Sequence, residues 1–230
     1  MPIPSLDPKY IALLVCGLTA SLGLDHQGRI KAGDKVLITA AAGGTGHIAV
    51  QWAKNRGCYV IGTASSQEKE DFLKSIGCDF VINYRKDDLN KVLTEKFPDG
   101  IDVIWETIGG ETYKTLFEHL GNKGRMVLVG SIQNYKTDGI RSQNIENLNG
   151  RLQFKAQSLN GFILFAYQDE IPTYFQKLVH EVDSGKIKIK IDLGERSPTH
   201  FEGLENVAAA EEWLHDSKNI GKVVVKIGSA

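Results

Sequence analysis

Short apolar runs alternate with amphipathic segments along the first half of the chain. Each run is bounded by glycine or polar residues, and all but the last precede a segment whose apolar positions recur at helical spacing. The five runs lie at residues 36–39, 59–63, 80–82, 101–105 and 125–129. Strands this short and apolar, alternating with helices, predict an α/β fold with a doubly wound parallel sheet covered on both faces.

The remaining pattern predicts the helices and the second half of the chain. Asp7 and Pro8 are typical of a helix start, because aspartate caps the first turn and proline fits its first position. Polar residues between 130 and 151 predict a long loop, which in a compact domain is usually functional or disordered. Strict alternation from 186 to 191 predicts a half-buried strand with its lysines outward. Further strands are expected at 158–164 and 223–225, and helices at 8–15, 19–28, 46–56, just before 77, 87–96, 111–120, 168–184 and 204–215.

Composition narrows the classes of protein that this fold can serve. The 230 residues carry 27 Lys+Arg against 28 Asp+Glu, a net charge of −1, which argues against nucleic-acid binding. No stretch is long and apolar enough to suggest a membrane span. Three cysteines without a Cys-x-x-Cys pair, and six scattered histidines, predict neither a disulfide framework nor a metal site. Reduced cysteines fit a cytoplasmic location best, and a peroxisomal one stays open.

A glycine-rich turn joins the first strand to its helix. It reads Ala40-Ala41-Ala42-Gly43-Gly44-Thr45-Gly46. Gly43 lets the backbone approach a pyrophosphate, Gly46 lets the helix pack on the strand, and Thr45 adds a hydroxyl donor. Ala41 stands where the usual G-x-G-x-x-G has its first glycine. Between a strand and a helix, this turn predicts a Rossmann-type dinucleotide site, the alternative being a helix start that binds nothing.

The residues after the second and third strands favour NADP(H) over NAD(H). An NAD site places Asp or Glu at the end of the second strand to hold the ribose 2′-OH, whereas this chain has Ser65 and, one helical turn later, Lys69. Tyr84 follows the third strand and can offer its hydroxyl to the same 2′-phosphate, beside the basic pair Arg85-Lys86. The alternative for Lys69 is an ordinary exposed lysine.

Several motifs in a fixed order resemble the zinc-free medium-chain dehydrogenase/reductases. The likeness covers essentially the whole chain and is greatest to the quinone oxidoreductase and prostaglandin reductase group, in particular to its prostaglandin reductase 3 subgroup. Besides the glycine turn and Ser65-x-x-x-Lys69, the motifs are Asn83-Tyr84, Ile108-Gly109-Gly110, Gly130-Ser131-Ile132-Gln133-Asn134-Tyr135, Asp192-Leu193-Gly194 and Asn219-Ile220-Gly221-Lys222.

The resemblance implies NADPH-dependent reduction of the C=C bond of an α,β-unsaturated ketone, of the 15-keto-prostaglandin 13-reductase or quinone reductase type. It also implies a role for each matching position. Tyr135 would stabilise the enolate that follows hydride transfer, the alternative being that its ring only packs on the cofactor. The implied cofactor contacts are Gly44, Thr45 and Gly46 for the pyrophosphate, Ser65, Lys69 and Tyr84 for the 2′-phosphate, Thr107 for the adenosine side, Val129, Gly130, Ile132 and Tyr135 for the nicotinamide ribose, Phe162, Ile163 and Leu164 for the carboxamide, and Asn219 from the C-terminal segment.

The same resemblance implies a domain organisation. Residues 1–20 correspond to the linker and helix that leave a GroES-like substrate domain, residues 21–185 to the NADP-binding domain, and residues 186–230 to the segment that returns to the substrate domain. The N-terminal part of that substrate domain is absent from this chain. We therefore expect either an enone or quinone reductase, or its cofactor-binding part, or a non-catalytic NADPH-binding module or sensor. A homodimer through the edge strand near residues 162–164 is a further expectation.

Overall fold

A six-stranded parallel sheet forms the centre of the molecule. The computed structural model describes residues 4–5, 7–135 and 145–228. The strand order is β3-β2-β1-β4-β5-β6, with every neighbouring pair parallel. The strands are β1 (Lys35–Ile38), β2 (Tyr59–Ala64), β3 (Phe80–Asn83), β4 (Ile101–Glu106), β5 (Leu120–Leu128) and β6 (Ser158–Gly161). The chain runs outward from β1 in one direction and from β4 in the other, so the predicted doubly wound α/β fold is confirmed.

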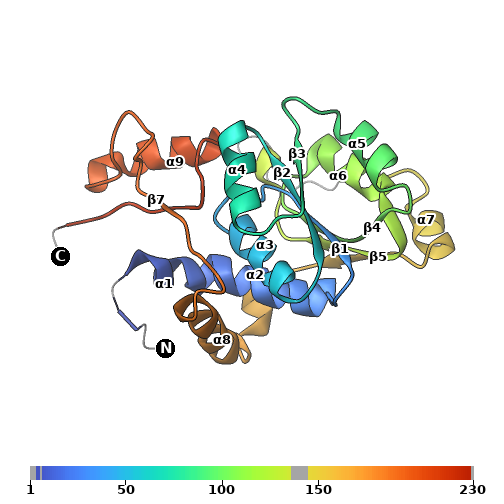
Figure 1. The fold of residues 1–230 in the computed structure, drawn as a ribbon, viewed down its shortest axis with the longest axis horizontal. Coiled ribbons are helices and arrows are strands. Elements are labelled where there is room, and N and C mark those ends of the chain that lie inside the picture. Colours follow the sequence, from blue (N-terminus) through green and yellow to red (C-terminus); the bar gives the residue numbers. More distant parts are fainter. Residues whose placement is uncertain (1–3, 6, 136–144, 229–230) are drawn as a thin grey trace.

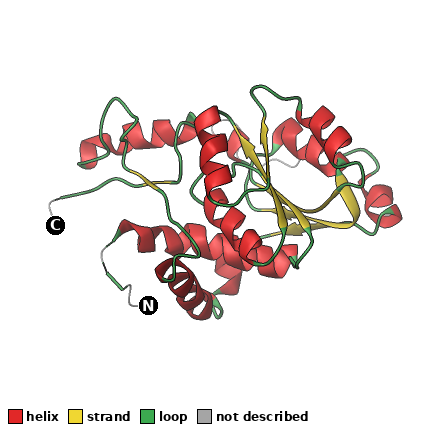
Figure 2. Ribbon diagram, viewed as in Figure 1, coloured by secondary structure: helices red, strands yellow, loops and turns green. Residues whose placement is uncertain are grey.

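Helices cover both faces of the sheet (Figures 1 and 2). Side chains alternate along each strand, so Val36 and Ile38 enter one core while Leu37 enters the other. The first core packs against the N-terminal helices together with α3, α4 and α8, and the second against α5, α6 and α7. The bounds are α3 (Gly46–Asn55), α4 (Gln67–Ser75), α5 (Leu89–Lys96), α6 (Gly110–Glu118), α7 (Leu148–Phe154) and α8 (Ile171–Asp183).

The N-terminal segment is one helical run, whereas the sequence predicted two helices. It comprises α1 (Pro8–Ala12) and α2 (Leu18–Leu22), joined and extended by π-helical turns at Leu13–Gly17 and Gly23–Gly28. Gly17 keeps helical dihedrals and lies tightly against a leucine of α8, so packing holds the helix through a residue of low helix propensity. The predicted cap is confirmed, since the Asp7 side chain accepts a hydrogen bond from the Lys9 N–H.

The prediction of a strand over residues 186–191 is wrong. Only β7 (Ile191–Asp192) pairs, in parallel with β8 (Lys222–Val223). Ile187 is buried and the lysines are exposed, so the burial pattern follows the alternation. The backbone of Lys188, however, bonds at both N–H and C=O to the side chain of Gln51 on α3, at 2.7 and 2.9 Å. An amide side chain thus satisfies this backbone where a neighbouring strand would otherwise do so.

The C-terminal segment lies beside the carboxyl ends of the first two strands (Figure 1). It carries β7, a short 3₁₀ turn (Leu204–Asn206), α9 (Val207–His215) and β8. An isolated bridge joins Gly43 in the glycine turn to Gly221 in the loop before β8. This contact brings two distant parts of the chain together at the edge where a parallel sheet places its ligands.

Candidate functional site

The predicted site residues share one edge of the molecule. All except Asn219, which lies in the loop before β8, follow the carboxyl end of a strand, where open α/β sheets bind ligands near the point at which strand order reverses. That point lies between β1 and β4. The side chain of Thr39 ties the two strand ends together there: its hydroxyl accepts from the Thr107 N–H at 3.0 Å and lies 2.9 Å from the Thr107 hydroxyl. Thr107 is therefore fixed beside the glycine turn, where the adenosine side was predicted.

The backbone of the glycine turn leaves no room for a side chain at its last glycine, Gly46. A Cβ on Gly46 would lie 2.3 Å from the carbonyl oxygen of Ala40, which is backbone and cannot swing aside. Ala40 itself has a positive φ of 46°, and its carbonyl accepts the Gly43 N–H at 2.9 Å. Thr45 occupies the N-cap position of α3, but its side chain makes no capping hydrogen bond. The N-terminus of α3 thus begins at a turn built of small residues, as an anion cradle requires.

The C-terminal loop is fastened to this turn. The Gly221 N–H donates to the Ala42 carbonyl at 2.7 Å, and a Cβ on Gly44 would meet the side chain of Lys222 at 3.2 Å. Asn219 is buried, with its amide donating to the Gly221 carbonyl at 2.9 Å. The structure thus places Asn219 next to the glycine turn, with its side chain folded back on its own loop.

His47, on the first turn of α3, completes this fastening. Its ring Nδ1 lies 2.8 Å from the Gly43 carbonyl, and its Nε2 accepts the Lys190 N–H at 3.2 Å. These two bonds require the neutral ring with its proton on Nδ1. Burial lowers the pKa of His47 to about 4, so the ring stays neutral at physiological pH. No motif in the sequence pointed to this histidine.

The loops after β4 and β5 are joined to each other. The N–H groups of Ile132 and Gln133 donate to the carbonyls of Thr107 and Ile108 at 3.0 and 3.1 Å. Gly109 has a φ of 80°, and a Cβ there would lie 2.2 Å from the Ser131 hydroxyl oxygen. The Ile108-Gly109-Gly110 motif therefore lets the two loops touch. Val129, Gly130 and Ile132 all lie in this joined region.

Buried Glu106 holds the first of these loops in shape. Its carboxylate accepts the Ile108 and Gly109 N–H groups at 2.7 and 2.9 Å. Burial raises the pKa of this carboxyl, while the backbone donors oppose that rise. No motif pointed to this residue.

Tyr135 ends the described part of the β5 loop. The residue is 49% exposed, and its hydroxyl accepts the Ser131 N–H at 3.2 Å. A Cβ on Gly130 would lie 2.8 Å from the same hydroxyl oxygen, so glycine is needed for this ring to fold back over the loop. The hydroxyl proton remains free to serve another acceptor, because the bond to Ser131 uses only a lone pair.

Residues 162–164 follow the edge strand β6. The Phe162 N–H continues the sheet pattern by donating to the Leu128 carbonyl at 3.0 Å, and its ring is buried against Tyr167. Ile163 is 64% exposed, and Leu164 begins a 3₁₀ turn. The strand predicted to reach residue 164 therefore ends at Gly161.

A pocket of about 420 Å³, lined mostly by residues with charged or hydroxyl side chains, opens at the carboxyl end of β2. The segment after β2 contributes the predicted residues Ser65 and Lys69, and Arg85 comes from the loop after β3. The C-terminal segment contributes the opposite wall, which the sequence analysis missed. The full lining is Ser65, Ser66, Glu68, Lys69, Arg85, Arg196, Trp213, Ser217 and Lys218.

Lys69 is buried at this pocket. Its ammonium donates to the Ser217 carbonyl at 2.6 Å, and its side chain leaves the first turn of α4, whose cap is the Ser66 hydroxyl. Burial, reinforced by the nearby charge of Arg196, lowers the pKa of Lys69 to about 8. The alternative of an ordinary exposed lysine is therefore wrong.

Tyr84 lies beside the pocket and does not line it. Its N–H donates to the Ala64 carbonyl at 3.1 Å, which places it at the end of β2. The residue is 45% exposed and is absent from the pocket lining within the described part of the chain. Lys86, from the predicted basic pair, bonds to Gln67 at 2.9 Å, whereas its neighbour Arg85 does line the pocket.

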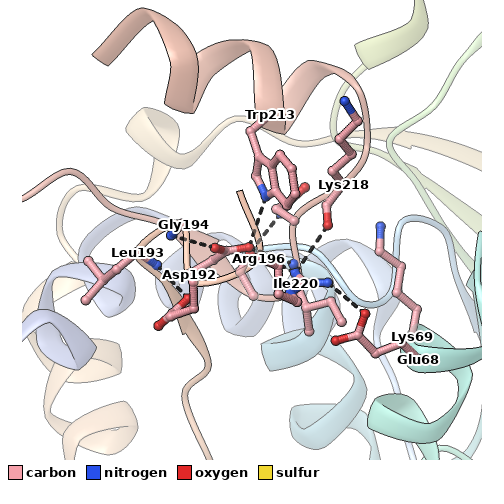
Figure 3. Close-up of polar contacts among 12 residues, drawn as sticks. Glu68, Lys69, Asp192, Leu193, Gly194, Arg196, Trp213, Lys218 and Ile220 are labelled. Carbon is pink, nitrogen blue, oxygen red and sulfur yellow. Dashed lines mark hydrogen bonds and ion pairs between the residues drawn. The ribbon is translucent and has the colours of Figure 1, made fainter. Parts of the chain in front are cut away.

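Asp192 organises the C-terminal wall (Figure 3). The residue is 1% exposed. Its Oδ2 accepts the Ile220 N–H at 3.1 Å, the Trp213 ring N–H at 3.3 Å and the Arg196 guanidinium at 3.2 Å. Its Oδ1 accepts the Gly194 N–H at 3.0 Å. One buried carboxylate thus holds β7, α9 and the loop before β8 together.

Neither a metal-binding group nor a membrane-spanning helix occurs in the described residues. Between residues 7 and 135 and between 145 and 228, no three His, Cys, Asp or Glu side chains gather in a group able to hold a metal ion. No helix in the same part of the chain is long and apolar enough to cross a membrane.

The strand order, and a glycine turn at the end of the first strand, define the class as a Rossmann-type dinucleotide-binding fold. Comparison with known protein families then identifies the family within this class. Residues 44–180 match the family model described as zinc-binding dehydrogenase, and the chain belongs to this family. The predicted membership of the medium-chain dehydrogenase/reductases is confirmed.

Individual relatives place the chain more narrowly. It is 43% identical to a probable quinone oxidoreductase of Leishmania amazonensis and 41% identical to prostaglandin reductase-3 of Mus musculus, over 99% of this chain in both cases. The predicted group is thereby confirmed. The chain spans 66% and 61% of the length of these two relatives, less than two thirds of each.

A solved structure agrees with the fold. The crystal structure of CurA from Vibrio vulnificus in complex with NADPH matches with a TM-score of 0.87 and 29% identity. The match covers 99% of this chain and 67% of the other.

Proposed function

We propose that this chain binds NADP(H) and serves an oxidoreductase that reduces the C=C bond of an α,β-unsaturated ketone or a quinone. When bound, the reduced nicotinamide supplies the hydride that adds to the β-carbon of such a substrate. The protein binds and orients the cofactor and the substrate, and it polarises the substrate carbonyl. The names of the relatives, quinone oxidoreductase and prostaglandin reductase, support this substrate class.

The cationic pocket at the end of β2 is the observation that carries the proposal. An NAD site needs a carboxylate there to hold the ribose 2′-OH, whereas Ser65, Lys69 and Arg85 line this one. Hydroxyl and cationic donors suit a phosphate monoester. The NADPH in the CurA complex belongs to a protein with the same fold, which supports the same choice.

The other predicted residues receive roles along the same edge of the sheet. Gly43, Gly44, Thr45 and Gly46 would hold the pyrophosphate at the N-terminus of α3, where backbone N–H groups are available. Thr107 would contact the adenosine side, the loop from Val129 to Tyr135 the nicotinamide ribose, and residues 162–164 the carboxamide. Asn219 would reach the cofactor from the C-terminal loop, and Tyr84 would close the 2′-phosphate site from its rim.

Titration with NADPH and NADH, followed by nicotinamide fluorescence, tests the binding half of the proposal. We expect selective binding of NADPH. Equal affinity for the two would contradict the assignment of the pocket, and binding of neither would contradict the whole proposal. NADPH consumption with an enone or a quinone then tests turnover, and selective binding without consumption would favour a binding module.

Tyr135 is the proposed catalytic residue. Its hydroxyl proton is available to a developing enolate, since the Ser131 N–H occupies only a lone pair of the oxygen. We expect Tyr135→Phe to lower kcat by roughly a hundredfold, the usual cost of an oxyanion donor, with NADPH affinity unchanged. Tyr59→Phe is the matched control, because Tyr59 lies at the amino end of β2, away from the carboxyl ends of the strands where the site lies. Full turnover by Tyr135→Phe would leave its ring a packing role only.

We also propose a homodimer through the edge strand β6. The sheet ends at this strand, and Ile163 and Phe165 beside it are 64% and 72% exposed. Light scattering should give the mass of two chains, and Phe165→Asp should give the mass of one. A single-chain mass for the unaltered protein at micromolar concentration would refute the dimer.

The cysteines support a cytoplasmic location, with the peroxisome as the alternative compartment. Cys16, Cys58 and Cys78 are buried free thiols, which suits a reducing environment. Imaging of a fluorescent fusion would decide, and a secretory distribution would contradict the proposal.

A further inference from the structure

Arg196 has two carboxylate partners of very different character, and its Nη2 also donates to the Lys218 carbonyl at 3.2 Å. Its Nη2 lies 3.2 Å from the Oδ2 of Asp192, whose side chain is 1% exposed, and its Nη1 lies 2.9 Å from Glu68, whose side chain is 59% exposed. The inner bond belongs to the buried hydrogen-bond network around Asp192, whereas the outer one is a surface ion pair, of a kind that contributes little to stability. The guanidinium is therefore anchored at one end and exchangeable at the other (Figure 3).

Cationic side chains outnumber carboxylates in the lining of the pocket, although Asp192 lies behind Arg196 and Asp216 pairs with Lys218 at 3.0 Å. Four cationic side chains line the pocket, those of Lys69, Arg85, Arg196 and Lys218, against the single carboxylate of Glu68. Two of these cations disfavour each other, because the charge of Arg196 lowers the pKa of Lys69. A phosphate dianion would relieve this repulsion and accept several charge-assisted hydrogen bonds at once.

We propose that Arg196 is a specificity-determining residue for NADP(H), which exchanges Glu68 for the 2′-phosphate of the cofactor while it remains bound to Asp192. This inference rests on the proposed function, since it assigns the second wall of the same pocket. Lys69 binds the phosphate from α4, and Arg196 binds it from the C-terminal segment. The 2′-phosphate is then held between two parts of the chain.

The inner partner of Arg196 extends its effect to the nicotinamide side. Asp192 also holds the Ile220 N–H, and the next residue, Gly221, donates to Ala42 in the glycine turn. Asn219 lies in this same loop. A phosphate bound at Arg196 thus steadies the loop that carries Asn219, so Arg196 is also a positioning residue.

A purely structural role for Arg196 makes a different prediction. If the pair with Glu68 only ties α4 to the C-terminal segment, its loss lowers stability and leaves cofactor selectivity unchanged. Arg151 offers a matched control, because it forms the same kind of ion pair with Glu118, between α7 and α6. That pair lies outside the pocket lining.

The test compares Arg196→Met, Glu68→Gln and Arg151→Met in titrations with NADPH, NADH and adenosine 2′,5′-bisphosphate. We expect Arg196→Met to weaken NADPH and the bisphosphate about tenfold or more, the loss of one charge-assisted bond, with NADH unchanged. Glu68→Gln should strengthen NADPH binding a few-fold, and by less when Arg196 is also replaced. Arg151→Met should change none of these affinities.

The outcomes separate the two proposals. If the unaltered protein prefers NADPH and Arg196→Met keeps the same NADPH/NADH ratio, Arg196 has no part in selectivity and the proposed function stands. If the unaltered protein binds neither NADPH nor the bisphosphate, the proposed function is overturned and this inference with it. Should Arg196→Met fail to fold, an unchanged NADPH affinity in Glu68→Gln would itself refute the exchange.

Discussion

NADPH affinity should fall as the pH rises above 8, because of the environment of Lys69. A phosphate binds the charged form of this lysine, and that form is the one disfavoured by burial and by the charge of Arg196. Glu68 and Asp192 oppose the shift and do not cancel it, so the pKa of Lys69 is lowered from 10.5 to about 8. The Lys69 side chain therefore loses its proton within a pH range in which binding of the cofactor can be measured.

The size of the effect follows from this pKa. With a value of about 8, roughly nine tenths of the free protein carries the charge at pH 7 and roughly one tenth at pH 9. If the dianion binds only the charged form, its apparent affinity falls about tenfold over these two units. NADH lacks the 2′-phosphate, so its affinity should stay constant over the same range.

The assay is a fluorescence titration with each dinucleotide at half-unit steps from pH 7 to 9.5. This range stays above the second phosphate pKa of about 6, so the ligand keeps one charge state. Lys69→Met serves as the reference variant: it should bind NADPH about tenfold more weakly at pH 7, with no further fall on the way to pH 9.

Two results would refute the reasoning. NADPH affinity that stays flat from pH 7 to 9.5 in the unaltered protein would mean that Lys69 does not titrate where its burial implies. An equal fall in Lys69→Met would assign the titration to another group.

Two further predictions concern stability. Burial holds the pKa of His47 near 4 against an ordinary 6.5, so between these pH values the unfolded chain binds a proton that the folded chain does not. The free energy of unfolding should therefore fall by about 3 kcal/mol as the pH drops from 6.5 to 4. Urea unfolding of the unaltered protein should show this pH dependence, and His47→Gln should lose it. Gly46→Ala should cost about 3 kcal/mol or more, since the new Cβ meets the Ala40 carbonyl, whereas Gly161→Ala, with open space around it, should change the thermal midpoint little; equal midpoints for the two variants would contradict this account of the turn.

The sheet could be predicted because its strands are local signals. β1 to β4 lie within one or two residues of the expected runs, since a strand buried on both faces is apolar throughout. The glycine turn is equally local, because its residues are adjacent in the sequence. These features fixed both the fold class and half of the candidate site.

The rest depended on contacts between distant segments. Residues 186–191 have the period of a strand, yet the side chain of Gln51 binds the backbone where a partner strand was expected. Arg196 stands alone in the sequence, and only the packing of α4 against the C-terminal segment brings it to Lys69. Asp192 was noted as part of a motif, while its three bonds through one oxygen are visible only in the fold.

The fastening of the C-terminal loop sets a limit for protein engineering. A fragment cut after residue 185 would retain all six strands of the large sheet and would pass for a minimal dinucleotide-binding module. It would nevertheless lose the donors to Ala42 and to the His47 ring, and the wall of the pocket opposite Lys69. A transplantable unit from this chain has to extend through β8, and chimeras joined at the last strand of the sheet would carry an unfinished site.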